Sequence, residues 1–412
     1  MGGAAGHLSH LHEDLTITFG DIKSVLQNVA EANIETYEKV DGQNILFTYH
    51  TPSASIKTAR NAGDLKRGGM SPDEFSSKWK GHPAEKAFIN GLKAINSAIS
   101  KIPEKELTKI FGNNGENFVN AEIMYVGNPN IVRYGANWIV LHGMTGPTKS
   151  DSGFNKLIEL VGNAEESIDN DNWKVSGPQI AQLNNISNDK HFETFSNKIS
   201  SINTLGDSAT LADFVEDQLN TGVLDNIDIT PTKKKQLIDI ILSKENAPRL
   251  IDIKKGLPKD TQKQLSAVAT KQNRYKLISK IVSPIENAIN DFAIEVLRGL
   301  KSFFAADHKN EIVRMRSELQ SAINNLQQVK GADAETISLM LDKQLSKLGR
   351  IENVASTMEG IVFEYPVGSK KLYKLTGAFA MANQIIGKSR RLKSENNNNK
   401  KTLLHNYIKY LL

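Results

Sequence analysis

The chain has 412 residues, of which 39% are apolar and 24% charged, and these proportions exclude a largely disordered or fibrous protein. It contains no cysteine, which excludes disulfides, thiolate metal sites and a cysteine nucleophile, and which agrees with a reducing cytoplasm. No apolar run reaches about 18 residues, and the first residues lack the basic start and apolar core of a signal peptide, so we expect no membrane partner. The length suits two domains or one elaborated domain.

The net charge of +5 is unevenly distributed. Segment 388–412 has seven basic residues and one acidic residue, so it carries +6 and the rest of the chain carries −1. Two interpretations stay open for this Asn-rich tail: it contacts the phosphates of a nucleic acid, or it is a solubilising, partly disordered end.

The first third of the chain mixes helical and strand patterns. The periodicity of apolar residues predicts helices over 19–30 and 83–100. Alternating and β-branched runs predict strands on both sides of Asp41-Gly42 within 36–50, then over 55–60, 118–125 and 137–142, with a turn at 127–129 joining the last two.

The middle of the chain is mostly helical in pattern. Helical periodicity predicts helices over 154–160, 211–219, 233–242 and 275–328, with Pro284 beginning or bending a helix. Strand patterns return at 360–365 and 371–375 and are followed by a helix over 379–386. We therefore expect an α+β protein with a discontinuous mixed domain (1–148 and 350–387), a helical insertion (149–349) and a basic tail (388–412).

Five short motifs carry reactive side chains at or beside predicted strands. They are Lys39-Val40-Asp41-Gly42, Arg60 in ARNAG, Glu122 in NAEIMY, Glu359-Gly360-Ile361-Val362, and Lys374 in LYKLTG. Each motif is common by chance, so the argument depends on their order along the chain.

In this order the motifs resemble those of the covalent nucleotidyltransferase superfamily, which comprises ATP-dependent DNA ligases, RNA ligases and mRNA capping enzymes. The spacing of the first three is most similar to that of bacteriophage RNA ligases, and EKVDGQN and ARNAG also resemble uncharacterised phage relatives of them. The resemblance covers about 15–145 and 350–387. It implies an antiparallel-sheet adenylation domain and the cytoplasm of a phage-infected bacterium.

The resemblance also implies roles for these residues. Lys39 would attack the α-phosphorus of ATP, for which its amine must be deprotonated. Arg60 would bind a phosphate or the 5′-phosphate end of the acceptor. Glu359 would place Mg²⁺ or Mn²⁺ against the phosphates, and Lys374 would neutralise charge on the α-phosphate.

The remaining nucleotide-binding candidates follow from the same resemblance. Asp41 and Gly42 belong to the lysine motif, and Glu122 would accept a hydrogen bond from the ribose. Leu141 occupies the position of the aromatic residue that stacks on adenine, although leucine stacks poorly on a base. The second lysine of the last motif is replaced by Leu372, and Lys371 is its nearest substitute.

Each candidate also has a purely structural interpretation. Lys39 could be a solvated strand-end lysine, Asp41-Gly42 a tight turn, Arg60 a surface arginine, Glu122 a strand-edge charge, and Glu359 a turn residue. The helical middle could grip a polynucleotide, with lysines 233–235 and 254–255 as phosphate contacts, or could be a packing insert. His7, His10 and His12 have the spacing of a metal site but lack an obvious fourth ligand. Gly387-Lys388-Ser389 is not a phosphate-binding loop, because position 382 is alanine.

The favoured hypothesis is an ATP-dependent polynucleotide ligase of the RNA-ligase type, with RNA or a nicked duplex as its partner. Lys39 would be adenylylated, AMP would pass to a 5′-phosphate, and a 3′-hydroxyl would displace AMP. Two alternatives stay open: a capping-like or other nucleotidyltransferase with a different acceptor, and a non-catalytic nucleic-acid-binding or virion-associated protein with the same fold.

Overall fold

The computed structural model of the chain describes residues 8–128, 130–183, 190–305 and 307–411. The protein is α+β, which confirms the expected class. Its described residues form two compact units. Unit 1 comprises residues 8, 35–183 and 297–411, and unit 2 comprises 9–34 and 190–296. Of the described helices, none is both long and apolar enough to cross a membrane.

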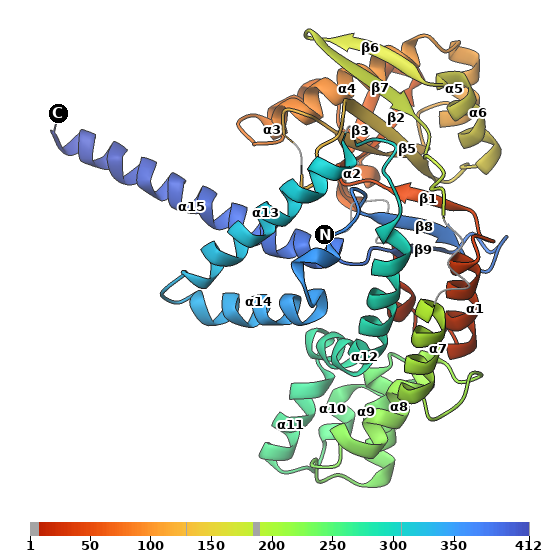
Figure 1. Ribbon diagram of the computed structural model, residues 1–412, viewed down its shortest axis with the longest axis vertical. Helices are drawn as coiled ribbons and strands as arrows, with labels where there is room; N and C mark the ends of the chain where they lie inside the picture. The colour runs from red at the N-terminus through yellow and green to blue at the C-terminus, as the bar shows by residue number, and fades with distance from the viewer. Residues whose placement is uncertain (1–7, 129, 184–189, 306, 412) are drawn as a thin grey trace. The chain divides into compact units, whose positions relative to one another are not determined.

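Unit 1 contains a six-stranded sheet (Figure 1). Its neighbouring strands run antiparallel, except for the parallel pair β5 and β7. In spatial order the strands are β3 (Ser55–Ala59), β2 (Gln43–His50), β4 (Phe118–Met124), β5 (Asn137–Thr145), β7 (Asp171–Ser176) and β6 (Ala164–Ile168).

One face of this sheet forms the main core of unit 1. Ile45, Ala121 and Leu141 form a cross-strand row on that face and are buried together with residues of four helices. The helix α4 presents Phe88, Leu92, Ile95 and Ile99 at three- and four-residue intervals, which is why one side of it is buried. The four helices are α3 (Pro72–Trp79), α4 (Glu85–Ser100), α5 (Glu104–Phe111) and α6 (Asp151–Val161).

A second, three-stranded antiparallel sheet joins the two ends of unit 1. Its strands, in spatial order, are β1 (Thr36–Lys39), β8 (Gly360–Glu364) and β9 (Leu372–Leu375). β1 and β2 therefore belong to different sheets, and Asp41-Gly42 lies in the crossing between them. The tight turn considered for this pair is wrong, because no hairpin joins the two strands.

The remaining helices of unit 1 lie mostly in its C-terminal part. Figure 1 shows α15 beside α13 and α14, and their residues are in contact. These elements are α2 (Ala62–Lys66), α13 (His308–Gln327), α14 (Ala334–Leu348) and α15 (Phe379–Leu411), with the 3₁₀ turns η2 (Thr51–Ser53) and η4 (Ile351–Asn353). The helix expected over 379–386 thus continues through the segment predicted to be a tail.

Unit 2 is helical and has its own apolar core, which includes Leu237, Leu265 and Val282. Pro284 lies inside α12, which neither begins nor ends there. The elements are η1 (Leu11–Glu13), α1 (Phe19–Ala30), α7 (Lys190–Ile202), α8 (Leu211–Gln218), the π-helical η3 (Leu219–Val223), α9 (Pro231–Ile241), α10 (Leu250–Lys254), α11 (Lys259–Ala269) and α12 (Lys271–Arg298), whose end enters unit 1.

The division of the chain differs from the one expected from its sequence. The expected helical insertion 149–349 includes β6 and β7, which are strands of the six-stranded sheet, and α6, which packs on that sheet. It also includes α13 and α14, which belong to unit 1. Conversely, the N-terminal helix α1 belongs to unit 2. The mixed unit is discontinuous, but its boundaries lie near residues 35, 183 and 297 instead of 148 and 350.

Candidate functional site

The three-stranded sheet brings Lys39 and Glu359 together from positions 320 residues apart. Lys39 is paired with Gly360 in the β1–β8 register, and the Glu359 N–H donates to the Lys39 carbonyl oxygen at 3.2 Å. The Lys39 Nζ then lies 2.6 Å from Glu359 Oε2, and less than a fifth of each side chain is exposed. The first and fourth motifs therefore form one contact.

Gly360 is fixed by the close approach of β9. A Cβ atom on Gly360 would lie 2.2 Å from the Leu375 carbonyl oxygen, so only glycine fits without a shift of the backbone. This explains why a glycine follows Glu359 in the motif.

Glu122 is the second carboxylate near Lys39. It lies on the face of the six-stranded sheet opposite the α3–α6 layer, because its neighbours Ala121 and Ile123 point into that core. Its Oε1 accepts a hydrogen bond from the Gly42 N–H at 2.8 Å. His142 Nε2 is 3.3 Å from Oε2 of Glu122, without the alignment of a hydrogen bond. The third motif thus meets the first through Gly42.

Asp41 is buried and held by the loop between β4 and β5. Its Oδ2 accepts hydrogen bonds from the backbone N–H groups of Ile131 at 2.7 Å and Val132 at 3.2 Å. The Asn130 side-chain amide lies 3.3 Å from Oδ1, and the Asp41 N–H donates to the Tyr134 hydroxyl. Burial nevertheless raises the pKa of Asp41 above its ordinary value.

The charges of this cluster are strongly coupled. Burial alone would lower the pKa of Lys39, but Glu359, Glu122 and Asp41 together hold it above its ordinary value. Burial raises the pKa of Glu359 to about 7, against the opposing effect of the Lys39 ammonium. Burial would also raise the pKa of Glu122, but Lys39 and His142 keep it below its ordinary value. The surrounding carboxylates thus hold Lys39 as an ammonium.

Arg60 follows β3 and lies against two rings. Its guanidinium carbon is 4.9 Å from the ring centroid of Phe88 and 5.6 Å from that of Trp79, which is a cation–π arrangement. Burial lowers the pKa of Arg60, although the charges of Asp64 and Glu122 oppose the shift. Arg60 is therefore within the electrostatic reach of Glu122.

The three-stranded sheet separates the two lysines of the last motif. In the register of this sheet, Lys39 is paired with Gly360 and Lys374 with Val362. Gly360 and Val362 are alternate residues of β8, so Lys39 and Lys374 lie on the same face of the sheet. Lys371 is exposed, and its Nζ is 5.7 Å from the ring centroid of the buried Tyr373, on the opposite face. Lys371 therefore lies away from the sheet face that carries Lys39 and Lys374, and its contact with a nucleotide stays a prediction.

Leu141 is in the wrong place for a nucleotide contact. It is 1% exposed and packs in the core beneath α4, on the face of the six-stranded sheet opposite Glu122. A bulge between Asn120 and Ala121 leaves His142 without a direct partner, and it is His142 that lies beside Glu122. The alternation of side chains along β5 accounts for the correction.

The other ligand candidates gain little from the fold. In the part of the chain that the structure describes, no three His, Asp or Glu side chains gather as a metal site. His7 lies outside the described residues, and the rings of His10 and His12 stack at 5.1 Å. Four of the five candidate helical lysines contact groups of unit 2, among them the Ile253 and Asn220 carbonyls; the four are Lys233, Lys234, Lys254 and Lys255.

We compared the chain with protein-family models, curated proteins and solved structures, and nothing matches it. The assignment of function therefore depends on the geometry of the site and on the motifs.

Several residues around the site were not predicted from the sequence. Asn130 and Tyr134, which contact Asp41, lie in a loop of irregular pattern, and only its position after a predicted strand pointed to it. His142 belongs to none of the motifs, and its position next to Leu141 is the only signal in the sequence that points to it. Arg390, which contacts the same loop, is one of the seven basic residues of segment 388–412, and nothing in the sequence distinguishes it from the others.

Proposed function

We propose that the chain is a covalent nucleotidyltransferase of the polynucleotide-ligase type, with Lys39 as its nucleophile and ATP as its nucleotide. The observation that carries the proposal is the contact of 2.6 Å between Lys39 and Glu359, two residues from separate motifs. Glu122 and Asp41 act on the same ammonium, and Lys374 shares its sheet face. Three of the motifs thereby act on one amine, and the last motif places Lys374 on the same face of its sheet.

The proposed first step is the transfer of a nucleotide to Lys39. As a free amine, Nζ attacks the α-phosphorus of ATP and a phosphorus–nitrogen bond forms. The bond from the α-phosphorus to the oxygen that bridges to the β-phosphorus breaks, and pyrophosphate leaves with that electron pair. The proton of the amine goes to solvent, and a lysyl-AMP remains.

The donor set fits one hard divalent cation. Mg²⁺ is usually bound through one or two carboxylates together with the phosphates of its substrate, so Glu359 alone suffices on the protein side. Glu359 would hold Mg²⁺ or Mn²⁺ there, and the cation would supply positive charge to the phosphates. The contact with Glu359 stabilises Lys39 as an ammonium, so the nucleophilic role requires this contact to loosen.

The later steps concern the polynucleotide. AMP passes from Lys39 to a 5′-phosphate, and a 3′-hydroxyl then attacks that phosphate and expels AMP. Arg60 and Lys374 are the cations we assign to phosphate groups in these steps. An acceptor other than a polynucleotide would leave the first step unchanged.

Covalent labelling tests the proposal. The purified chain is incubated with Mg²⁺ and α-labelled ATP or GTP and analysed on a denaturing gel, beside Lys39→Ala and the exposed control Lys149→Ala. We expect label in the wild type and in Lys149→Ala but not in Lys39→Ala. No label from folded wild-type protein with either nucleotide would favour a non-catalytic protein in which the Lys39–Glu359 pair only joins two strands.

A second assay identifies the acceptor. Labelled chain is offered 5′-phosphorylated single-stranded RNA and a nicked duplex. Joined product from the RNA or from the nicked duplex supports the ligase. If neither substrate takes up the label, the result supports a nucleotidyltransferase with another acceptor.

A further inference from the structure

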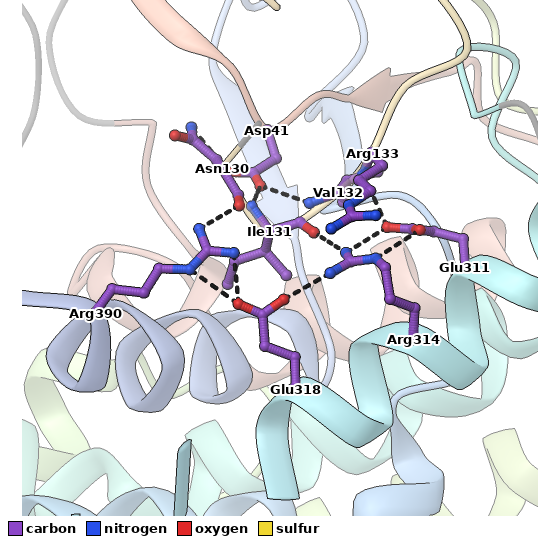
Figure 2. A network of polar contacts seen from close by, with 9 residues as sticks. All are labelled: Asp41, Asn130, Ile131, Val132, Arg133, Glu311, Arg314, Glu318 and Arg390. Carbon is purple, nitrogen blue, oxygen red and sulfur yellow. Dashed lines mark hydrogen bonds and ion pairs between the residues drawn. The ribbon is translucent and has the colours of Figure 1, made fainter. Parts of the chain in front are cut away.

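The loop that holds Asp41 is contacted from its other side by two helices. Ile131 and Val132 direct their N–H groups to Asp41. The carbonyl oxygens of Asn130 and Ile131 point away from Asp41 and accept hydrogen bonds from Arg390 of α15 and Arg314 of α13 (Figure 2). Each of these two peptide groups is thus bound at both of its ends.

A peptide group is planar, so its N–H and its C=O turn together. The Asn130 carbonyl and the Ile131 N–H belong to one peptide group, and the Ile131 carbonyl and the Val132 N–H belong to the next. A guanidinium on a carbonyl oxygen fixes that plane and polarises the N–H at its far end. Each arginine therefore orients and strengthens one of the two hydrogen bonds to Asp41.

Glu318 of α13 links the two arginines. It accepts hydrogen bonds from Arg314 Nη1 at 2.6 Å and from Arg390 Nε at 2.9 Å (Figure 2). Glu311, which is 7% exposed, binds Arg314 Nε at 2.8 Å and also accepts from the Arg133 N–H at 2.8 Å. The arginines are thus held by carboxylates before they reach the loop.

We propose that Arg314, Glu318 and Arg390 are positioning residues for Asp41, and through it for Lys39, two residues earlier in the chain. The inference about catalysis rests on the proposed function, but the placement of Asp41 does not. Arg390 lies in the basic segment 388–412, so the first part of this segment acts on the site instead of serving only as charge.

Amide hydrogen exchange tests the placement directly. Glu318→Gln keeps the shape of the side chain but weakens its hold on both arginines, and Arg390→Ala removes one carbonyl contact. Arg391→Ala is the matched control, because it removes the same charge from the next position of α15, where the side chain, among the described residues, contacts Gly387 of its own helix. We expect the Ile131 amide to exchange about tenfold faster in both of the first two variants, the Val132 amide to exchange about tenfold faster in Glu318→Gln, and neither amide to change in the control.

Two results would overturn the inference. One is unchanged exchange over 130–134 in both Glu318→Gln and Arg390→Ala. The other is a rise that is uniform over the whole chain and follows a lower melting temperature, because that would show a general loss of stability instead of a local release of the loop.

Labelling at saturating ATP gives the second readout. If the wild type is labelled, Glu318→Gln and Arg390→Ala should form label about tenfold more slowly, and Arg390→Lys should lie between them and the wild type because lysine lacks the planar fork. Rates equal to that of Arg391→Ala would reject the link to Lys39. An unlabelled wild type would reject the proposed function, and the exchange experiment would still decide the placement of Asp41.

Discussion

At the scale of single residues, two variants separate the contributions of Lys39 and Glu359 to the stability of the fold. Lys39→Met leaves the Glu359 carboxylate largely buried without its partner, and we expect the free energy of unfolding to fall by about 3 kcal/mol. The double variant Lys39→Met, Glu359→Gln has no charge to compensate, so it should regain most of this loss. Urea denaturation at pH 8 measures both. A loss below about 0.5 kcal/mol in the single variant would mean that the pair is effectively solvated.

Gly42 lies where the neighbouring strand β4 leaves no room for a side chain. A Cβ atom there would lie 2.7 Å from Glu122 Cγ and 2.7 Å from the Ile123 carbonyl oxygen, which belongs to the β4 backbone and cannot move alone. We expect Gly42→Ala to lower the free energy of unfolding by about 1–3 kcal/mol.

The matched control for this prediction is Gly143→Ala in the neighbouring strand β5. No atom lies within 4 Å of a Cβ at that position, so its free energy of unfolding should change by about 0.5 kcal/mol or less. Thermal or urea unfolding of the two variants side by side gives the comparison. A similar loss of unfolding free energy at both positions would mean that the backbone between β1 and β2 can shift to accommodate a Cβ atom at Gly42.

At the scale of elements, Glu38 ties β1 to the segment that follows α12. It is 4% exposed and accepts hydrogen bonds from the Ser302 hydroxyl and, at 2.8 Å, from the Phe303 N–H. Burial raises the pKa of Glu38 to about 7, against the effect of these donors. The folded state therefore binds this proton more tightly than the unfolded state, whose carboxyl has a pKa of about 4.3.

The sign of the pH dependence follows from this difference. The contribution of Glu38 to stability is complete below about pH 4 and is lost as the pH rises through about 7, which amounts to about 4 kcal/mol. Glu38→Gln can keep both contacts without titrating, so its stability should fall less than that of the wild type between pH 5 and pH 8. Urea denaturation across this range measures the slopes. The exposed Glu165→Gln is the control, and a wild-type slope in Glu38→Gln would contradict the assignment.

The elements themselves were well predicted where a periodic pattern was strong. The helix 19–30 and the strands around Asp41-Gly42 were confirmed with nearly the expected bounds. Their partners were not predictable in the same way, because a run of alternating residues does not show which sheet it joins. The hairpin of β6 and β7 was missed although it turns at Asp169-Asn170, both with positive φ, because only Trp173 and Val175 give its second strand an apolar face.

The candidate site was predictable to the extent that its residues stand in recognisable motifs. Lys39, Glu122 and Glu359 meet as those motifs suggested, whereas Leu141 and Lys371 point to the other faces of their sheets. Leu141 is directed to the core by the alternation of side chains along β5, and the apolar run Ile139-Val140-Leu141 does not show which face of its strand is buried. The contacts of Arg314 and Glu318 depend on the packing of α13 against the loop after β4, so the sequence did not predict them either.

At the scale of the whole molecule, the C-terminal segment 388–412 has two different parts. Its first part is attached to unit 1, since Ser389 is buried and Arg390 contacts both Glu318 and the Asn130 carbonyl. The helix α15 continues from residue 396 to Leu411. Residues 396–412 contain three lysines and no acidic residue, so ending the chain at Glu395 lowers the net charge from +5 to +2. This truncation removes charge while keeping the contacts of Arg390.

The salt dependence of binding to single-stranded RNA decides between the two roles left open for this segment. If the three lysines contact phosphates, the logarithm of the binding constant should depend on the logarithm of the salt concentration with a slope about 2 smaller in the chain that ends at Glu395. We expect this result, and we expect the covalent labelling rate to stay as in the full chain because Arg390 is kept. Equal slopes for the two chains would assign residues 396–412 to solubility alone. A slower labelling rate in the chain that ends at Glu395 would mean that α15 needs its full length to hold the Asp41 loop.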